Sequence, residues 1–146
     1  MTKEEKYNTI IQEARELVCG EDDMVAKMST LSALIHGEMG FWWTGFYIVH
    51  GDTLVVGPFQ GPIACLRIKR GHGVCGAAWQ QANTIVVPDV HKFPGHIACS
   101  AESKSEIVVP VFRDSEVIAV LDIDSTEPGT FDEIDAKCLG AIVTLI

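Results

Sequence analysis

The spacing of hydrophobic residues changes from a helical period to a strand period near residue 42, and this change constrains the fold more than any other feature. Before it, apolar residues recur every three or four positions in two segments, as in amphipathic helices. After it, short β-branched and aromatic runs are separated by turn residues such as His50-Gly51-Asp52, which is typical of strands joined by hairpins. Helical spacing returns after Thr130.

The ends of the predicted elements follow from caps and breakers. Thr2 with Glu5, and Thr130 with Glu133, have the spacing of capping boxes, and Gly20 is placed to end the first helix. We expect helices over 3–19, from Asp22 to Gly37–Gly40, over 77–82 and from Thr130 onward, and strands over 42–50, 54–56, 63–69, 84–87, 106–112 and 117–124.

This order of elements predicts an α+β fold in a single domain over residues 1–146. About six strands would form a mostly antiparallel sheet, with the N- and C-terminal helices covering one face. The irregular segments 57–62, 71–82 and 88–105 would gather on the other face. Because loops over a rigid scaffold are where binding sites are built, we expect the functional site there.

Composition excludes several classes of function. The chain has 146 residues, is 47% hydrophobic and carries a formal net charge of -9, which is unfavourable for binding nucleic acid or an anionic membrane. No apolar run approaches the roughly 18 residues that cross a bilayer. The first ten residues, MTKEEKYNTI, are charged and amphipathic, unlike a signal peptide. We therefore expect a cytoplasmic protein.

Five cysteines, an odd number without a signal peptide, argue against a structural disulfide framework. Most cytosolic cysteines are simply small buried hydrophobic residues. Three have distinctive surroundings. Cys65 falls on the strand predicted over 63–69. Cys75 falls in the first turn of the helix after the glycine-rich turn, where the helix dipole favours a thiolate. Cys99 falls in the loop that begins at Phe93, seven residues before Glu106.

Two other motifs carry little weight. The segment 71–76 (GHGVCG) fits the GxGxxG pattern of dinucleotide-binding folds, but the helix after it is too short for a parallel crossover. A glycine turn into a short helix explains it better. His91, His96 and Cys99 match no known zinc spacing, so no metal site is predicted.

Three carboxylates converge on one region of the predicted sheet. Asp122 and Asp124 alternate with apolar residues, so both point to one side of their strand, and Glu106 begins the neighbouring strand. Such acids repel one another and raise at least one pKa, unless a cation lies between them. They would form either a solvated sheet face or an ammonium-binding pocket. Trp43 and Tyr47, with Trp42 nearby, would supply an aromatic wall suited to a cation or a methyl-sulfur group, or else would pack in the core.

Several segments together resemble one family. GPFQGPIAC at 57–65, GHGVCGAA at 71–78, DVHKFPGHIAC at 89–99, SEIVVPVF at 105–112 and VLDIDS at 120–125 are similar to the free methionine-(R)-sulfoxide reductases, which are small stand-alone GAF-domain enzymes. The resemblance extends from Trp42 to Ser125. One departure is Ser100-Ala101-Glu102, where the family usually has an Asp after the loop cysteine.

The resemblance implies a set of roles. Cys99 would attack the sulfoxide sulfur and become a sulfenic acid, and Cys65 would then form a disulfide with it, with Cys75 as an alternative or relay thiol. Glu106, Asp122 and Asp124 would hold the substrate ammonium and help to protonate the oxygen. Trp43 and Tyr47 would contact the methyl-sulfur end. No bound cofactor is implied; thioredoxin, reduced by NADPH through thioredoxin reductase, would restore the thiols.

Two other functions stay open from the sequence. A GAF domain can bind a small molecule without turning it over, and a thiol redox switch needs no organic substrate. The amphipathic terminal helices suit the interface of a homodimer and the core of a monomer equally well. His96 and backbone amides are the evident groups that could favour a Cys99 thiolate.

Overall fold

The computed structural model describes residues 1–97 and 101–146. Its helices are α1 (Lys3–Leu17), α2 (Met24–Met39), α3 (Gly73–Gln81) and α4 (Glu133–Val143), with a 3-10 turn η1 (Val90–Lys92). Its strands are β1 (Trp43–His50), β2 (Thr53–Gln60), β3 (Arg67–Lys69), β4 (Ile85–Val87), β5 (Ser105–Arg113) and β6 (Glu116–Ser125).

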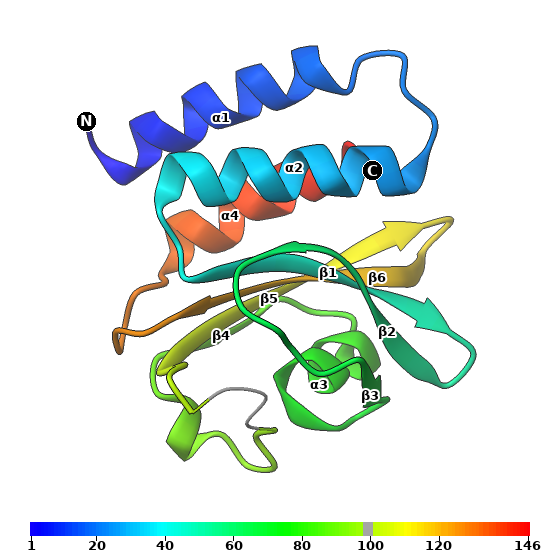
Figure 1. The fold of residues 1–146 in the computed structure, drawn as a ribbon, viewed down its shortest axis with the longest axis vertical. Coiled ribbons are helices and arrows are strands. Elements are labelled where there is room, and N and C mark those ends of the chain that lie inside the picture. Colours follow the sequence, from blue (N-terminus) through cyan, green and yellow to red (C-terminus); the bar gives the residue numbers. More distant parts are fainter. Residues whose placement is uncertain (98–100) are drawn as a thin grey trace.

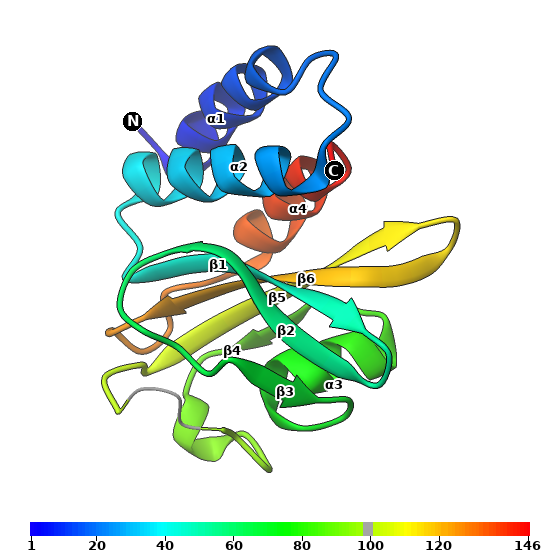
Figure 2. The ribbon, with the colours of Figure 1, turned by 45° about the vertical axis from the view of Figure 1, so that its right-hand side comes forward.

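The strands form one antiparallel sheet in the order β3-β2-β1-β6-β5-β4. Helices α1, α2 and α4 lie over one face, whereas α3 and the long loops lie on the other (Figures 1 and 2). This arrangement confirms the predicted α+β fold. None of the helices in the described part of the chain is both long and apolar enough to cross a membrane.

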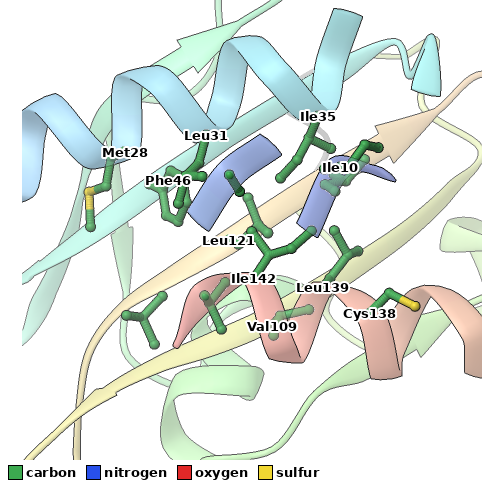
Figure 3. Close-up of a cluster of buried hydrophobic side chains, with 14 of the residues drawn as sticks. Ile10, Met28, Leu31, Ile35, Phe46, Val109, Leu121, Cys138, Leu139 and Ile142 are labelled. Atoms are coloured by element: carbon green, nitrogen blue, oxygen red, sulfur yellow. The ribbon is translucent and has the colours of Figure 1, made fainter. Parts of the chain in front are cut away.

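The larger hydrophobic core lies between the sheet and the three terminal helices (Figure 3). Met28, Leu31 and Ile35 of α2 are fully buried at helical spacing and pack toward Phe46 of β1. A second core lies on the opposite face, under α3 and the loops, and contains Trp43 and Tyr47. Each strand of the central pair β1 and β6 contributes to both cores. The site and the main core therefore share a rigid sheet.

One capping prediction is confirmed and one is wrong. The Thr2–Glu5 capping box begins α1, as predicted. The box that begins α4 uses Asp132 and Asp135 instead of Thr130 and Glu133. The Thr130 hydroxyl is occupied elsewhere, because it donates to Ser125 Oγ at 2.6 Å and to the Glu127 carbonyl at 3.1 Å. Cys19 is an exposed free thiol after α1.

The strands beside the site differ from the prediction at both ends of the connection between β2 and β3. Strand β2 continues to Gln60 through the predicted loop, because a bulge opposite Phe46 accommodates Pro58, which lacks an N–H. Strand β3 begins at Arg67 instead of Ile63. Pro62 and Cys65 direct their carbonyl groups to Trp43 and Tyr47 side chains instead of a neighbouring strand. Cys65 is therefore in a connecting segment, not on a strand.

A buried polar contact ties α1 to α4. The Tyr7 hydroxyl donates to Asp135 Oδ1 at 2.6 Å, and Lys3 Nζ donates to Asp135 Oδ2 at 2.7 Å. We expect Tyr7→Phe to lower the free energy of unfolding by about 1–2 kcal/mol, because it leaves a buried carboxylate oxygen without a donor. Urea denaturation measures this. Thr9→Ala, which removes an exposed hydroxyl from the same helix, should change stability by less than about 0.5 kcal/mol.

Candidate active site

Three carboxyl groups from two neighbouring strands lie on the sheet face covered by α3. Glu106 of β5 is directly opposite Asp124 of β6, and Asp122 is opposite Val108 one pair further along. On the other side of β6, Asp124 faces Trp43 and Asp122 faces Gly45. The alternation predicted from the sequence therefore does bring the three acids together.

Glu106 and Asp122 are buried, and Asp124 is partly buried. Burial raises the pKa of Asp122, and it raises those of Glu106 and Asp124 well above their ordinary values because the Asp122 charge adds to the effect. Hydrogen bonds from Glu106 and Cys75 oppose the shift at Asp122. We expect Glu106 and Asp124 to retain protons near neutral pH, while Asp122 ionises most readily. Among the described residues, buried Asp122 Oδ1 has no hydrogen-bond partner, so one strong acceptor remains available to a ligand.

Two polar neighbours complete the acid cluster. The Ser103 hydroxyl, which the sequence analysis did not select, donates to Asp124 Oδ1 at 3.1 Å. His96 Nε2 lies 3.9 Å from Glu106 Oε1. Burial lowers the pKa of His96, with a smaller contribution from His91, so the contact joins a neutral imidazole to a protonated acid. His96 is therefore a weaker source of positive charge than the sequence suggested.

An aromatic wall faces the acids. Trp43 and Tyr47 stack with ring centroids 6.0 Å apart, and Phe59 of β2 stacks on Trp43 at 5.2 Å. This confirms that the two predicted rings share a face; Phe59 was missed because its segment was read as a loop. Gly45 makes the stack possible, since a Cβ there would lie 2.3 Å from Phe59 Cβ and 2.7 Å from the Trp43 ring.

Cys75 lies in the first turn of α3, as predicted, but its thiol is not activated there. It is buried, and burial raises its pKa well above the ordinary value, with further contributions from the charges of Asp122 and Glu106. These effects outweigh the helix dipole, which is worth only about 0.3–1 kcal/mol. The predicted thiolate at Cys75 is therefore wrong. The thiol donates a hydrogen bond to Asp122 instead.

The glycine-rich segment 71–76 is not a dinucleotide fingerprint: α3 begins within it at Gly73, four residues before the predicted start at 77. Gly71 and Gly73 have φ of +77° and +64°, and a Cβ on Gly76 would lie 2.5 Å from the Lys69 carbonyl oxygen. In the described part of the chain, the strand after α3 pairs antiparallel with β5, so the parallel return strand of a dinucleotide-binding fold is absent.

The other two predicted thiols are placed differently. Cys65 is partly buried in the segment that connects β2 to β3, and it is disulfide-bonded. Cys99 lies outside the described residues, so its predicted role stays a prediction.

One cavity collects the predicted substrate-binding residues. It is lined by Trp42, Trp43, Tyr47, Pro62, Ile63, Ala64, Ile68, Gly73, Cys75, His96, Ile97, Ser103, Glu106, Asp122 and Asp124. Among the described residues, the Cys75 sulfur and one carboxylate oxygen each from Glu106 and Asp122 lie within 4.8 Å of one another, close enough to ligate an ion. This set differs from His91, His96 and Cys99, which the sequence analysis considered. An ammonium group fits the same oxygens.

Comparison with known proteins identifies the family. The GAF domain family matches residues 28–146. GAF domain-containing protein A of Dictyostelium discoideum is 49% identical over 146 residues, which cover 99% of this chain and 92% of that protein. Free methionine-R-sulfoxide reductase of Escherichia coli is 44% identical over 144 residues, which cover 98% and 87%. The chain belongs to the GAF-domain family of free methionine-R-sulfoxide reductases.

The structural comparison agrees. The X-ray structure of free methionine-R-sulfoxide reductase from Neisseria meningitidis, in complex with its substrate, superposes with a TM-score of 0.97 at 45% identity and covers 99% of this chain and 88% of that chain. The short motifs predicted membership of the free methionine-R-sulfoxide reductase family, and the comparisons confirm it over nearly the whole chain.

The close approach at Gly45 gives a stability test. We expect Gly45→Ala to lower the thermal midpoint by several degrees, because the new methyl group meets a ring and a Cβ within 3 Å. Differential scanning calorimetry measures this. Gly37→Ala is the matched control: a Cβ there meets nothing within 4 Å, and within α2 it should be neutral or stabilising by up to about 1 kcal/mol. Equal effects of the two substitutions would contradict the crowding argument.

The acid cluster gives a pH test. An acid whose pKa is raised in the folded state binds more protons than in the unfolded state, so its stability contribution is complete below its ordinary pKa and is lost as pH rises. We expect the unliganded protein to lose stability as pH increases from about 4.5 toward 8. Glu106→Gln should flatten this decline by up to about 1.4 kcal/mol per pH unit. Denaturant unfolding at several pH values measures it, with Glu116→Gln, an exposed acid of β6, as the control.

Proposed function

We propose that the chain reduces free methionine-(R)-sulfoxide to methionine through a cysteine thiol, and that residues 1–146 act as one GAF domain. The observation that carries this proposal is a single cavity in which three buried acids, one with an unpartnered oxygen, face a stacked aromatic wall. The substrate has a matching ammonium group and a matching methyl-sulfur end. The names of the relatives support the same activity.

The acids would select for the free amino acid. Asp122, whose Oδ1 has no donor within residues 1–97 and 101–146, would bind the substrate ammonium, with Asp124 and Glu106 beside it. Peptide-bound methionine sulfoxide has an amide in place of the ammonium, so it would leave the buried Asp122 oxygen without its charged partner. Segments 62–64 and 96–97 line the cavity and would limit the room for a polypeptide on either side of the residue.

Trp43, Tyr47 and the acid Glu106 would take part in the chemical step. Trp43 and Tyr47 would hold the methyl-sulfur group, since sulfur contacts aromatic rings favourably. The raised pKa of Glu106 keeps a proton available near neutral pH. Glu106 would donate it to the sulfoxide oxygen as that oxygen gains electron density.

We assign the nucleophile to Cys99. Its thiolate would attack the sulfoxide sulfur while one proton is supplied to the substrate oxygen. The protonated oxygen then passes to the cysteine sulfur, so that methionine leaves as a neutral thioether and Cys99 becomes a sulfenic acid. The Cys65 thiol would then attack that sulfenic sulfur, releasing water and forming a disulfide. The disulfide bonding of Cys65 supports its role as the resolving thiol. Cys75, buried and protonated, would contribute a hydrogen bond to Asp122.

The catalytic cycle would be completed outside the cavity. A dithiol protein of the thioredoxin type would reduce the disulfide, with electrons from NADPH through thioredoxin reductase and no prosthetic group on this chain. A reducing cytoplasmic compartment, where these proteins operate, fits this cycle.

Coupled NADPH oxidation tests the proposal. With thioredoxin and its reductase present, we expect turnover of free methionine-(R)-sulfoxide, and none of the (S) epimer or of a peptide-bound sulfoxide. Binding of methionine sulfoxide without turnover would favour a sensor, and thiol oxidation by peroxide without sulfoxide turnover would favour a redox switch.

Three substitutions assign the residues. We expect Cys99→Ser to abolish turnover, whereas Cys19→Ser, which changes an exposed free thiol, should leave it unchanged. Glu106→Ala should reduce kcat/KM by roughly 10²–10⁴-fold, through lost proton supply and weaker binding. Wild-type activity in Cys99→Ser would move the nucleophile to Cys75.

A further inference from the structure

The short segment between β2 and β3 exposes two large hydrophobic side chains beside Cys65. Ile63 is 89% exposed and Leu66 is 71% exposed. Such side chains are individually unremarkable on a surface, but these two flank a disulfide-bonded cysteine that is itself partly exposed. A protein that exchanges thiols with Cys65 must contact this surface.

The backbone of this segment is held in place from the site side. Trp43 Nε1 donates to the Pro62 carbonyl at 2.9 Å, and the Tyr47 hydroxyl donates to the Cys65 carbonyl at 2.8 Å. The Leu66 carbonyl accepts from the Val56 amide at 2.9 Å. Because three carbonyl groups on both sides of Cys65 are fixed toward the protein, the exposed side chains are presented without the entropy cost of ordering a loop on binding.

The charged residues near Cys65 in the sequence are basic, although the whole chain is acidic. The protein has 20 acidic residues and a net charge of -9, but the stretch from residue 53 to residue 88 contains no Asp or Glu. Arg67 and Lys69 of the edge strand β3 are exposed, and neither forms an ion pair within the described part of the chain. Glu106, Asp122 and Asp124 line the cavity on the inner side of this segment, whereas Arg67 and Lys69 are exposed on its outer side. At physiological salt the Debye length is about 8 Å, so these two exposed cations dominate the charge that a partner docked on β3 would meet.

We propose that Ile63, Leu66, Arg67 and Lys69 form the docking surface for the reductant, an acidic dithiol protein of the thioredoxin type with apolar surface around its thiols. This inference rests on the proposed function. A small surface suffices, since transient redox complexes bury less than about 1,200 Å² in total.

The docked reductant acts on Cys65 by disulfide exchange. One reductant thiolate attacks Cys65 Sγ, so a mixed disulfide forms and the sulfur previously bonded to Cys65 leaves as a thiolate. The second reductant thiol then attacks the mixed disulfide and releases Cys65. The reductant is oxidised by two electrons to its disulfide, and this chain is returned to its dithiol form.

The test separates docking from catalysis by changing the reductant. Turnover is measured once with dithiothreitol and once with Escherichia coli thioredoxin, its reductase and NADPH. Leu66→Ser and Arg67→Glu are made singly and together; neither residue lines the substrate cavity. Phe112→Ser with Arg113→Glu is the matched control. Phe112 is a hydrophobic residue that is 50% exposed, and it is followed by an exposed arginine. Both lie at the β5–β6 hairpin, which is away from the 61–66 segment in both ribbon views (Figures 1 and 2).

We expect the double variant at 66 and 67 to raise the KM for thioredoxin about fivefold to tenfold, with dithiothreitol-driven turnover within twofold of wild type. The wild-type KM should also rise with salt, and Arg67→Glu should weaken that dependence. The hairpin control should behave as wild type in every assay.

Each other outcome has a definite meaning. An unchanged KM for thioredoxin, or an equal change in the hairpin control, overturns the docking surface and leaves the proposed function standing. Absence of dithiothreitol-driven turnover in the wild type overturns the proposed function, and the docking inference with it. If light scattering shows that the double variant loses a dimer present in the wild type, the surface contacts a second copy of the chain and the inference is wrong.

Discussion

Three carboxyl groups share one cavity, and no Lys or Arg is among the described residues that line it. Burial and the neighbouring Asp122 charge raise the pKa of Glu106 and of Asp124 well above their ordinary values. Asp122 Oδ1 has no hydrogen-bond partner in the part of the chain that the structure describes. The cavity is thus electrostatically incomplete until a cation enters, and it can also donate a proton. The acids lie close together because the strands that carry them pair in one sheet. The main core packs between the opposite face of that sheet and three helices.

The aromatic wall links the cavity to the surface. Trp43 and Tyr47 face the cavity with their rings, while their polar atoms hold the carbonyl groups of Pro62 and Cys65. The same two side chains therefore position the methyl-sulfur end of the proposed substrate and the segment that carries the proposed resolving cysteine. Gly45 allows this arrangement by leaving space for Phe59 to stack on Trp43. Substrate binding and thiol exchange thus share one structural support.

Most of the fold was predictable because hydrophobic periodicity and turn residues are local signals. The pairing of β5 with β6 and of β1 with β2 follows from their short connections, and the acid cluster follows from strand alternation. The errors occurred where distant groups decide local structure. Cys65 is not on a strand because its carbonyl accepts a hydrogen bond from the Tyr47 hydroxyl. Thr130 does not cap α4 because its hydroxyl is hydrogen-bonded to Ser125 and Glu127. Phe59 and Ser103 were missed, since neither has a distinctive sequence context.

The sequence alone determined the α+β class, the family, and the side of the sheet on which Glu106, Asp122 and Asp124 lie, because alternation along a strand leaves only two faces. Only the tertiary structure decided their protonation. A pKa depends on how far burial removes water and on which charges lie within a few ångströms, and neither is encoded in local spacing. For the same reason the helix dipole at Cys75 predicted a thiolate, whereas burial of the thiol, with a further contribution from the acids beside it, raises its pKa well above the ordinary value.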